Sequence, residues 1–235
     1  MIRLLIGAVV AAMVGCGLGW VAVPMLAQFL ARRAVARAGA WGEESIGEAT
    51  RGAARAAPHD GRWRDAGALG AFCAALVLMG LGPLDVGLLV AAGVALAAAA
   101  LCDVRVGLIP WEACAVVGAT GLAVQARCLG LGGVCWGALY AGVVIVACSA
   151  LNARFERRGR CGIGGGDVRC MAALSLASGQ AAPWGLLASC LAMVFMGVRS
   201  RIVEGRRFDD PRPMAPAFAP WLLCAALWCA VATAA

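Results

Sequence analysis

The chain contains no lysine, a single histidine and a single tyrosine, and charged residues make up only 14% of its 235 residues. A soluble domain is nearer a quarter charged and half apolar. Here 63% of the residues are apolar, the mean hydropathy is +0.85, and no polar stretch is long enough to build a soluble core. The composition therefore predicts a polytopic helical membrane protein.

The sequence also lacks any C-x-x-C pair, although it has 12 cysteines. Most of these cysteines stand inside apolar stretches, where cysteine packs as a small hydrophobic residue. We therefore predict neither a zinc site nor a disulfide framework. The lone histidine, His59, follows Pro58 in a polar stretch, and we expect it to be solvated rather than catalytic.

Long apolar blocks alternate with short polar segments along the whole chain. The blocks cover residues 4–31, 66–82, 84–102, 111–129, 132–151, 168–198 and 216–234. Gly82-Pro83 and Gly130 to Gly133 predict tight turns between neighbouring helices. We expect block 168–198 to turn near residues 179–183 and to cross the membrane twice, with one kinked helix as the alternative.

The predicted fold is an all-α membrane bundle of about eight helical segments (six to eight), forming one domain over residues 1–235. The first block resembles a signal peptide, but at roughly 1.5 Å per residue it exceeds a ~30 Å bilayer core. We therefore expect it to be retained as a membrane anchor. Residues 32–65 are expected to form a cytoplasmic loop within the domain.

The distribution of arginine predicts the orientation in the membrane. Eighteen of the 20 basic residues fall in four polar segments: seven in 32–65, one in 103–110, five in 152–169 and five in 199–212. If two spans separate successive segments, all four lie on one side, which the positive-inside rule places in the cytoplasm. Arg3 and Arg127 are the exceptions. Because the net charge of +7 is confined to loops, we expect no nucleic-acid partner.

Four acids near the apolar blocks need an explanation, because acids beside lipid are costly. Asp85 follows Gly82-Pro83, and we expect it to be a helix N-cap. Glu112 follows Pro110 and would occupy the first turn of a helix, where the helix dipole favours an anion. Neither of these two positions requires catalytic chemistry.

Asp103 and Asp167 are the more informative acids. Asp103 ends an apolar block and could simply pair with Arg105, while Asp167 follows a glycine loop and could be an N-cap. On the predicted topology, however, both lie at the cytoplasmic mouth of the membrane. Two carboxylates sharing a partly desolvated site take up different pKa values. One can then act as a base toward water while the other donates a proton to a scissile carbonyl.

Two motifs that contain these aspartates resemble those of a known family. Asp103, Arg105, Ile109 and Pro110 match a D-x-R-x-x-x-I-P string, and Gly164, Gly166, Asp167 and Arg169 match a G-x-G-D string followed by a basic residue. A weaker likeness is Phe218-Ala219-Pro220. The chain is thus similar, over residues 84–230, to the type IV prepilin leader peptidases.

The resemblance implies a membrane aspartic endopeptidase whose catalytic residues are Asp103 and Asp167. Gly164, Gly166, Pro110, Arg105 and Arg169 would bind the substrate or shape the site. The implied substrates are prepilins or pseudopilins, whose basic leader is cleaved at the cytoplasmic face of the bacterial inner membrane. Larger members carry two C-x-x-C pairs in a cytoplasmic loop, and many also use S-adenosylmethionine to methylate the new N-terminus. The 32–65 loop lacks cysteine, so we expect no zinc, and we expect S-adenosylmethionine as a cofactor only if methylation is retained.

Two other interpretations compete with this one. A non-enzymatic polytopic protein, such as a small transporter or a subunit of a secretion apparatus, could use both acids for helix capping or a proton path. The presenilin-like group shares the G-x-G-D string but pairs it with a tyrosine–aspartate motif. Tyr140 is the only tyrosine here and is followed by alanine, which disfavours that group.

Overall fold

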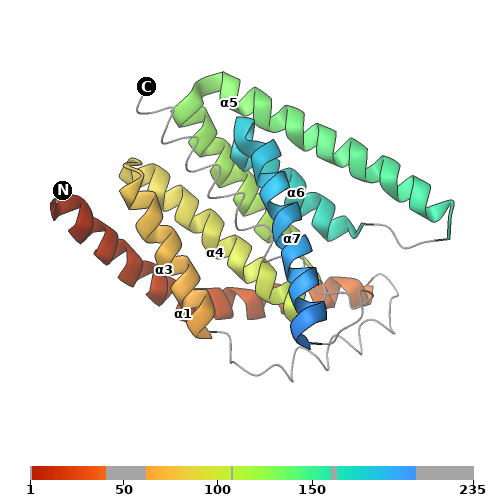
Figure 1. The fold of residues 1–235 in the computed structure, drawn as a ribbon, viewed down its shortest axis with the longest axis horizontal. Helices are drawn as coiled ribbons and strands as arrows, with labels where there is room; N and C mark the ends of the chain where they lie inside the picture. The colour runs from red at the N-terminus through yellow and green to blue at the C-terminus, as the bar shows by residue number, and fades with distance from the viewer. Residues whose placement is uncertain (1, 41–61, 107, 160–162, 205–235) are drawn as a thin grey trace.

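The computed structural model describes residues 2–40, 62–106, 108–159 and 163–204. Regular structure in these ranges is entirely helical, which confirms the all-α fold class (Figure 1). The elements are α1 (Ile2–Ala40), α3 (Arg62–Leu78), α4 (Pro83–Val106), α5 (Trp111–Glu156), α6 (Gly165–Ser178), the 3-10 turn η1 (Gly179–Ala181) and α7 (Ala182–Glu204). Block 216–234 and His59 lie outside the described residues, so the count of about eight segments stays a prediction.

Three of the helices are long and apolar enough to cross a membrane. The stretches concerned are Leu4–Arg33, Pro83–Asp103 and Trp111–Glu156. Large apolar side chains on them point away from the protein, among them Met13, Met25 and Val146, each at least two-thirds exposed. Such an outer surface suits lipid rather than water, which supports the prediction of a membrane protein.

The helix α5 changes direction at Gly130. This residue has φ 64° and ψ −154°, a conformation in which the helix cannot continue and which side chains with a Cβ rarely adopt. Figure 1 shows the resulting two limbs, 111–129 and 131–156, running in different directions from the bend. The turn predicted between residues 130 and 133 is therefore confirmed.

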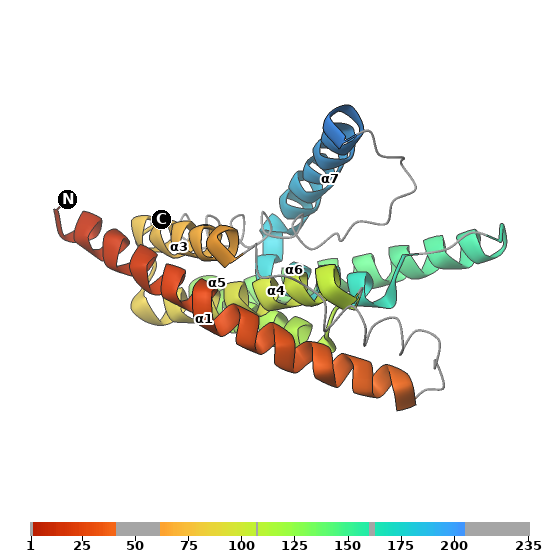
Figure 2. The ribbon, with the colours of Figure 1, turned by 90° about the horizontal axis from the view of Figure 1, so that it is seen from below.

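A second break separates α6 from α7. Gly179 has φ 52° and is followed by the short turn η1, as the Gly179–Pro183 stretch predicted. In Figure 2, α7 leaves the bundle at a steep angle to α6. Residues 168–198 thus form two helical limbs rather than one kinked helix, and their crossing of the membrane stays a prediction.

Several helices extend beyond the apolar blocks that predicted them. Helix α1 continues past Arg32 and Arg33 to Ala40, α4 reaches Val106, and α5 reaches Glu156. Of the polar segment 152–169, residues 152–156 therefore belong to α5 and residues 165–169 to α6. The apolar composition ends where the lipid ends, whereas the helix itself can continue into water because its backbone hydrogen bonds remain intact. A basic residue such as Arg154 also favours a helix C-terminus through the helix dipole.

Helix α6 packs against both limbs of α5 through glycines. A Cβ on Gly121 would overlap the backbone and side chain of Ala177, and one on Gly137 would lie 2.8 Å from the carbonyl oxygen of Leu176. Gln125 adds a fixed link, since its Nε2 donates to the carbonyl oxygen of Ala177 at 2.8 Å. These close approaches hold the short α6 between the two limbs of α5.

The expected role of Asp85 as an N-cap is wrong. Helix α4 begins at Pro83, so Asp85 already lies inside its first turn. Its Oδ1 accepts a hydrogen bond from Nε of Arg127 at 2.8 Å, forming an ion pair between α4 and the first limb of α5. The pair also gives a structural role to Arg127, one of the two arginines outside the polar segments.

Candidate active site

The two aspartates singled out by the sequence come together in the fold. Asp103 lies in the last turn of α4 and Asp167 in the first turn of α6, and each is partly buried. Their carboxylates are near enough to repel each other electrostatically. Two helix ends from distant parts of the chain therefore present a pair of acids to one another.

The segment between α4 and α5 lies directly against the glycines that precede Asp167. A Cβ on Gly166 would stand 3.1 Å from Cβ of Ile109. The next residue, Pro110, is buried and is the N-cap of α5, with φ −66° and ψ 132°. Proline suits this position because it fixes φ and has no N–H group to leave unpaired. The contact keeps the end of α4 close to the start of α6.

Space, rather than backbone conformation, explains the glycines at positions 164 and 166. None of the three glycines from 164 to 166 has a positive φ. A Cβ on Gly164 would lie 3.0 Å from Oδ2 of Asp167, and one on Gly166 would press on Ile109, whereas the nearest atom to one on Gly165 is an arginine nitrogen at 3.6 Å. Positions 164 and 166 of the G-x-G-D string are thus crowded, whereas position 165 is open.

Burial dominates the electrostatics of Asp167. Although the helix N-terminus favours an anion there, removal of the carboxyl from water raises its pKa above the ordinary value. Within the described part of the chain, Asp85 has its arginine partner, but neither Asp103 nor Asp167 forms an ion pair with a described cation. The side chain of Arg105 lies outside the described residues, so its pairing with Asp103 stays a prediction.

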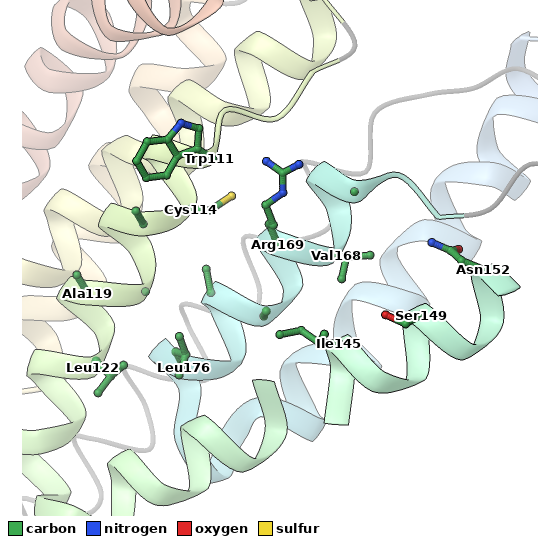
Figure 3. Close-up of a pocket in the computed structure, with 15 residues that line it drawn as sticks. Trp111, Cys114, Ala119, Leu122, Ile145, Ser149, Asn152, Val168, Arg169 and Leu176 are labelled. Carbon is green, nitrogen blue, oxygen red and sulfur yellow. The ribbon is translucent and has the colours of Figure 1, made fainter. Parts of the chain in front are cut away.

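A groove of about 660 Å³ lies between α6 and the two limbs of α5 (Figure 3). Trp111, Arg169 and Asn152 stand toward one end of it, and Leu122 and Leu176 toward the other. Neither Asp103 nor Asp167 lines the groove. At 100° per residue, Arg169 and Leu176 share one face of α6 and Asp167 lies on the opposite face. The predicted site-shaping residue Arg169 therefore belongs to the groove, behind the carboxylates.

Sequence reasoning missed Asn152, which lies in the second limb of α5. Its side chain hydrogen-bonds the backbone of Ile163, at the start of the glycine stretch. Asn152 belongs to no recognised motif. An isolated amide at the end of an apolar block could nevertheless have indicated a polar contact there. No group of three or more His, Cys, Asp or Glu residues in the described ranges is placed to hold a metal ion.

Comparison with known families bears on this arrangement. A family model described as the type IV leader peptidase family matches residues 90–198. Over these residues the chain is similar to the type IV leader peptidase family. The region begins within α4, ends within α7 and includes both Asp103 and Asp167. The match confirms the family resemblance, and the family implies a peptidase. No curated protein and no solved structure matches the chain.

Proposed function

We propose that the chain is a membrane aspartic endopeptidase that cleaves the basic leader of type IV prepilins or pseudopilins at the cytoplasmic face of the bacterial inner membrane. The observation that carries the proposal is the meeting of Asp103 and Asp167 at the ends of α4 and α6. The family match supports a peptidase, and the two acids supply the chemistry that peptide hydrolysis needs.

The proposed mechanism uses one proton shared by the carboxyl pair. The ionised carboxylate removes a proton from a water molecule, whose oxygen attacks the carbonyl carbon of the scissile bond. The protonated carboxyl donates to the carbonyl oxygen, and the C–N bond then breaks as the leaving nitrogen takes up a proton. Burial, which raises the pKa of Asp167, favours retention of the shared proton near neutral pH. The titration belongs to the pair rather than to either residue.

The orientation of the site is inferred from charge. Arg154, Arg157 and Arg158 are exposed around the end of α5, at the start of the loop that leads to Asp167. Such a basic loop is typical of the cytoplasmic side of an inner-membrane protein. A leader that is still in the cytoplasm would meet the carboxyl pair from that side. The proposal covers cleavage alone and does not include methylation by S-adenosylmethionine.

The test is expression with a prepilin in a bacterial host that lacks its own leader peptidase. The wild-type chain should convert the precursor to the mature pilin, and Asp103→Asn and Asp167→Asn should each abolish conversion. Processing by either variant, once its insertion in the membrane is verified, would show that the dyad mechanism is wrong.

Asp85→Asn is the matched control for these substitutions. It removes an acid of the same kind, also in the first turn of a helix, but one that is held by Arg127. Processing should continue in this variant, with some loss of thermal stability. If Asp85→Asn also abolished processing while remaining inserted, loss of activity could not be assigned to the Asp103–Asp167 pair.

A further inference from the structure

The connection between α5 and α6 needs an external restraint if it is to hold Asp167 in place. Gly162 and Gly164 flank Ile163 at the end of this connection, and the first two residues of α6, Gly165 and Gly166, are glycines as well. Glycine loses more conformational freedom on folding than any other residue. A segment of this composition does not by itself fix the direction in which the following helix begins.

Asn152 supplies such a restraint through two hydrogen bonds to one residue. Its Nδ2 donates to the carbonyl oxygen of Ile163 at 3.0 Å, and its Oδ1 accepts from the backbone N–H of Ile163 at 2.6 Å. Both bonds are partly buried, and the Ile163 side chain packs against the main core cluster. The amide therefore satisfies both backbone polar groups of Ile163 and fixes that residue against α5.

The restrained residue immediately precedes the helix that carries Asp167. Gly164 is the N-cap of α6, and its carbonyl oxygen accepts the first helical hydrogen bond from Val168 N at 3.1 Å. The Asp167 carboxylate lies close to Gly164, since a Cβ on that glycine would be 3.0 Å from its Oδ2. Fixing Ile163 thus fixes the first turn of α6 and, through it, the position of the carboxylate relative to Asp103.

We propose that Asn152 is a positioning residue of the peptidase, which holds the glycine loop through Ile163 so that Asp167 meets Asp103 in reactive geometry. This inference rests on the proposed function. Asn152 touches neither carboxylate, so its removal should affect the rate of the chemical step more than the binding of substrate. Misplacement of a catalytic group by 1 Å costs roughly 100-fold in rate, so a partly loosened loop should cost about tenfold.

The experiment compares four full-length proteins in detergent or nanodiscs with a purified prepilin: wild type, Asn152→Ala, Asn152→Gln and Ser149→Ala. Asn152→Ala should lower kcat about tenfold with KM changed less than about twofold. Asn152→Gln keeps both hydrogen-bonding groups and should recover part of kcat. Ser149→Ala removes an exposed hydroxyl one turn earlier on the same limb and should match the wild type.

Amide hydrogen exchange of Ile163 gives a readout that does not depend on the substrate. The wild-type amide should be protected, and Asn152→Ala should accelerate its exchange while the amides in the middle of α6 keep their protection. A wild-type kcat in Asn152→Ala, no recovery in Asn152→Gln, or an unprotected Ile163 amide in the wild type would each overturn the inference. A protected Ile163 in a protein that cleaves no prepilin would instead count against the proposed function alone.

Discussion

The glycines before Asp167 offer the sharpest test of the site geometry, because three adjacent glycine-to-alanine changes should give different results. Gly166→Ala places a Cβ 3.1 Å from that of Ile109, and Gly164→Ala places one 3.0 Å from Oδ2 of Asp167. Gly165→Ala meets nothing closer than the mobile end of Arg169, at 3.6 Å. None of the three changes strains φ, so space alone distinguishes them.

The expected size of each effect follows from these distances. Contacts below 3.4 Å are rare, so Gly166→Ala and Gly164→Ala each require a shift of a few tenths of an ångström. Given roughly 100-fold in rate per ångström of misplacement, such a shift costs about fivefold in kcat. Gly164→Ala should exceed this, because the atom that must move is a carboxylate oxygen of the reaction itself. Gly165→Ala should keep the wild-type kcat and gain up to about 1 kcal/mol of stability, because alanine has fewer conformations than glycine in the unfolded chain.

The assay is prepilin cleavage by purified protein under single-turnover conditions, together with a thermal melt of each variant. The melt separates a displaced carboxylate from an unfolded protein, since only the former lowers the rate at an unchanged melting temperature. If Gly165→Ala lost as much activity as Gly166→Ala, the explanation of the G-x-G-D spacing by local space would be wrong.

Two further predictions concern stability. The raised pKa of Asp167 means that the folded state binds this proton more tightly than the unfolded state, so stability falls as pH rises above the ordinary carboxyl pKa of about 3.9. Asp167→Asn should therefore melt at a higher temperature than the wild type at pH 7, with the difference shrinking toward pH 4; an equal or lower melting temperature at pH 7 would contradict the burial argument. In the core, Gly121→Ala should destabilise the protein by about 1–3 kcal/mol because its Cβ overlaps Ala177. Gly118→Ala, whose Cβ would meet its nearest neighbour at 3.6 Å, should be neutral or mildly stabilising, and equal effects in the two melts would count against close α5–α6 packing.

Much of the architecture could be predicted because it depends on local composition. Long apolar blocks predict helices, since a single segment in lipid can satisfy its own backbone groups only through intrahelical hydrogen bonds. Gly130 and Gly179 marked the two sharp breaks correctly, because the chain there adopts a positive φ that glycine favours. The pairing of Asp103 with Asp167 as a catalytic dyad, drawn from two short motifs and a family resemblance, stays a prediction.

Other features depended on contacts between distant parts of the chain or on helix geometry, neither of which hydropathy records. Asp85 was expected to be an N-cap, but its partner is Arg127 on another helix. The predicted ends of α4 and α5 were too early, because hydropathy follows the edge of the membrane and not the end of the helix. Arg169 lies two residues from Asp167 in sequence, yet the helical rotation places it in a groove on the opposite face of α6.

The sequence by itself determined a helical membrane protein with two aspartates at helix ends, since hydropathy and glycine chemistry act locally along the chain. Only the tertiary structure decided how these aspartates are held: by Ile109 against Gly166, and by Asn152 on the backbone of Ile163. Those contacts join residues on different elements, and their geometry exists only after α4, α5 and α6 have packed together.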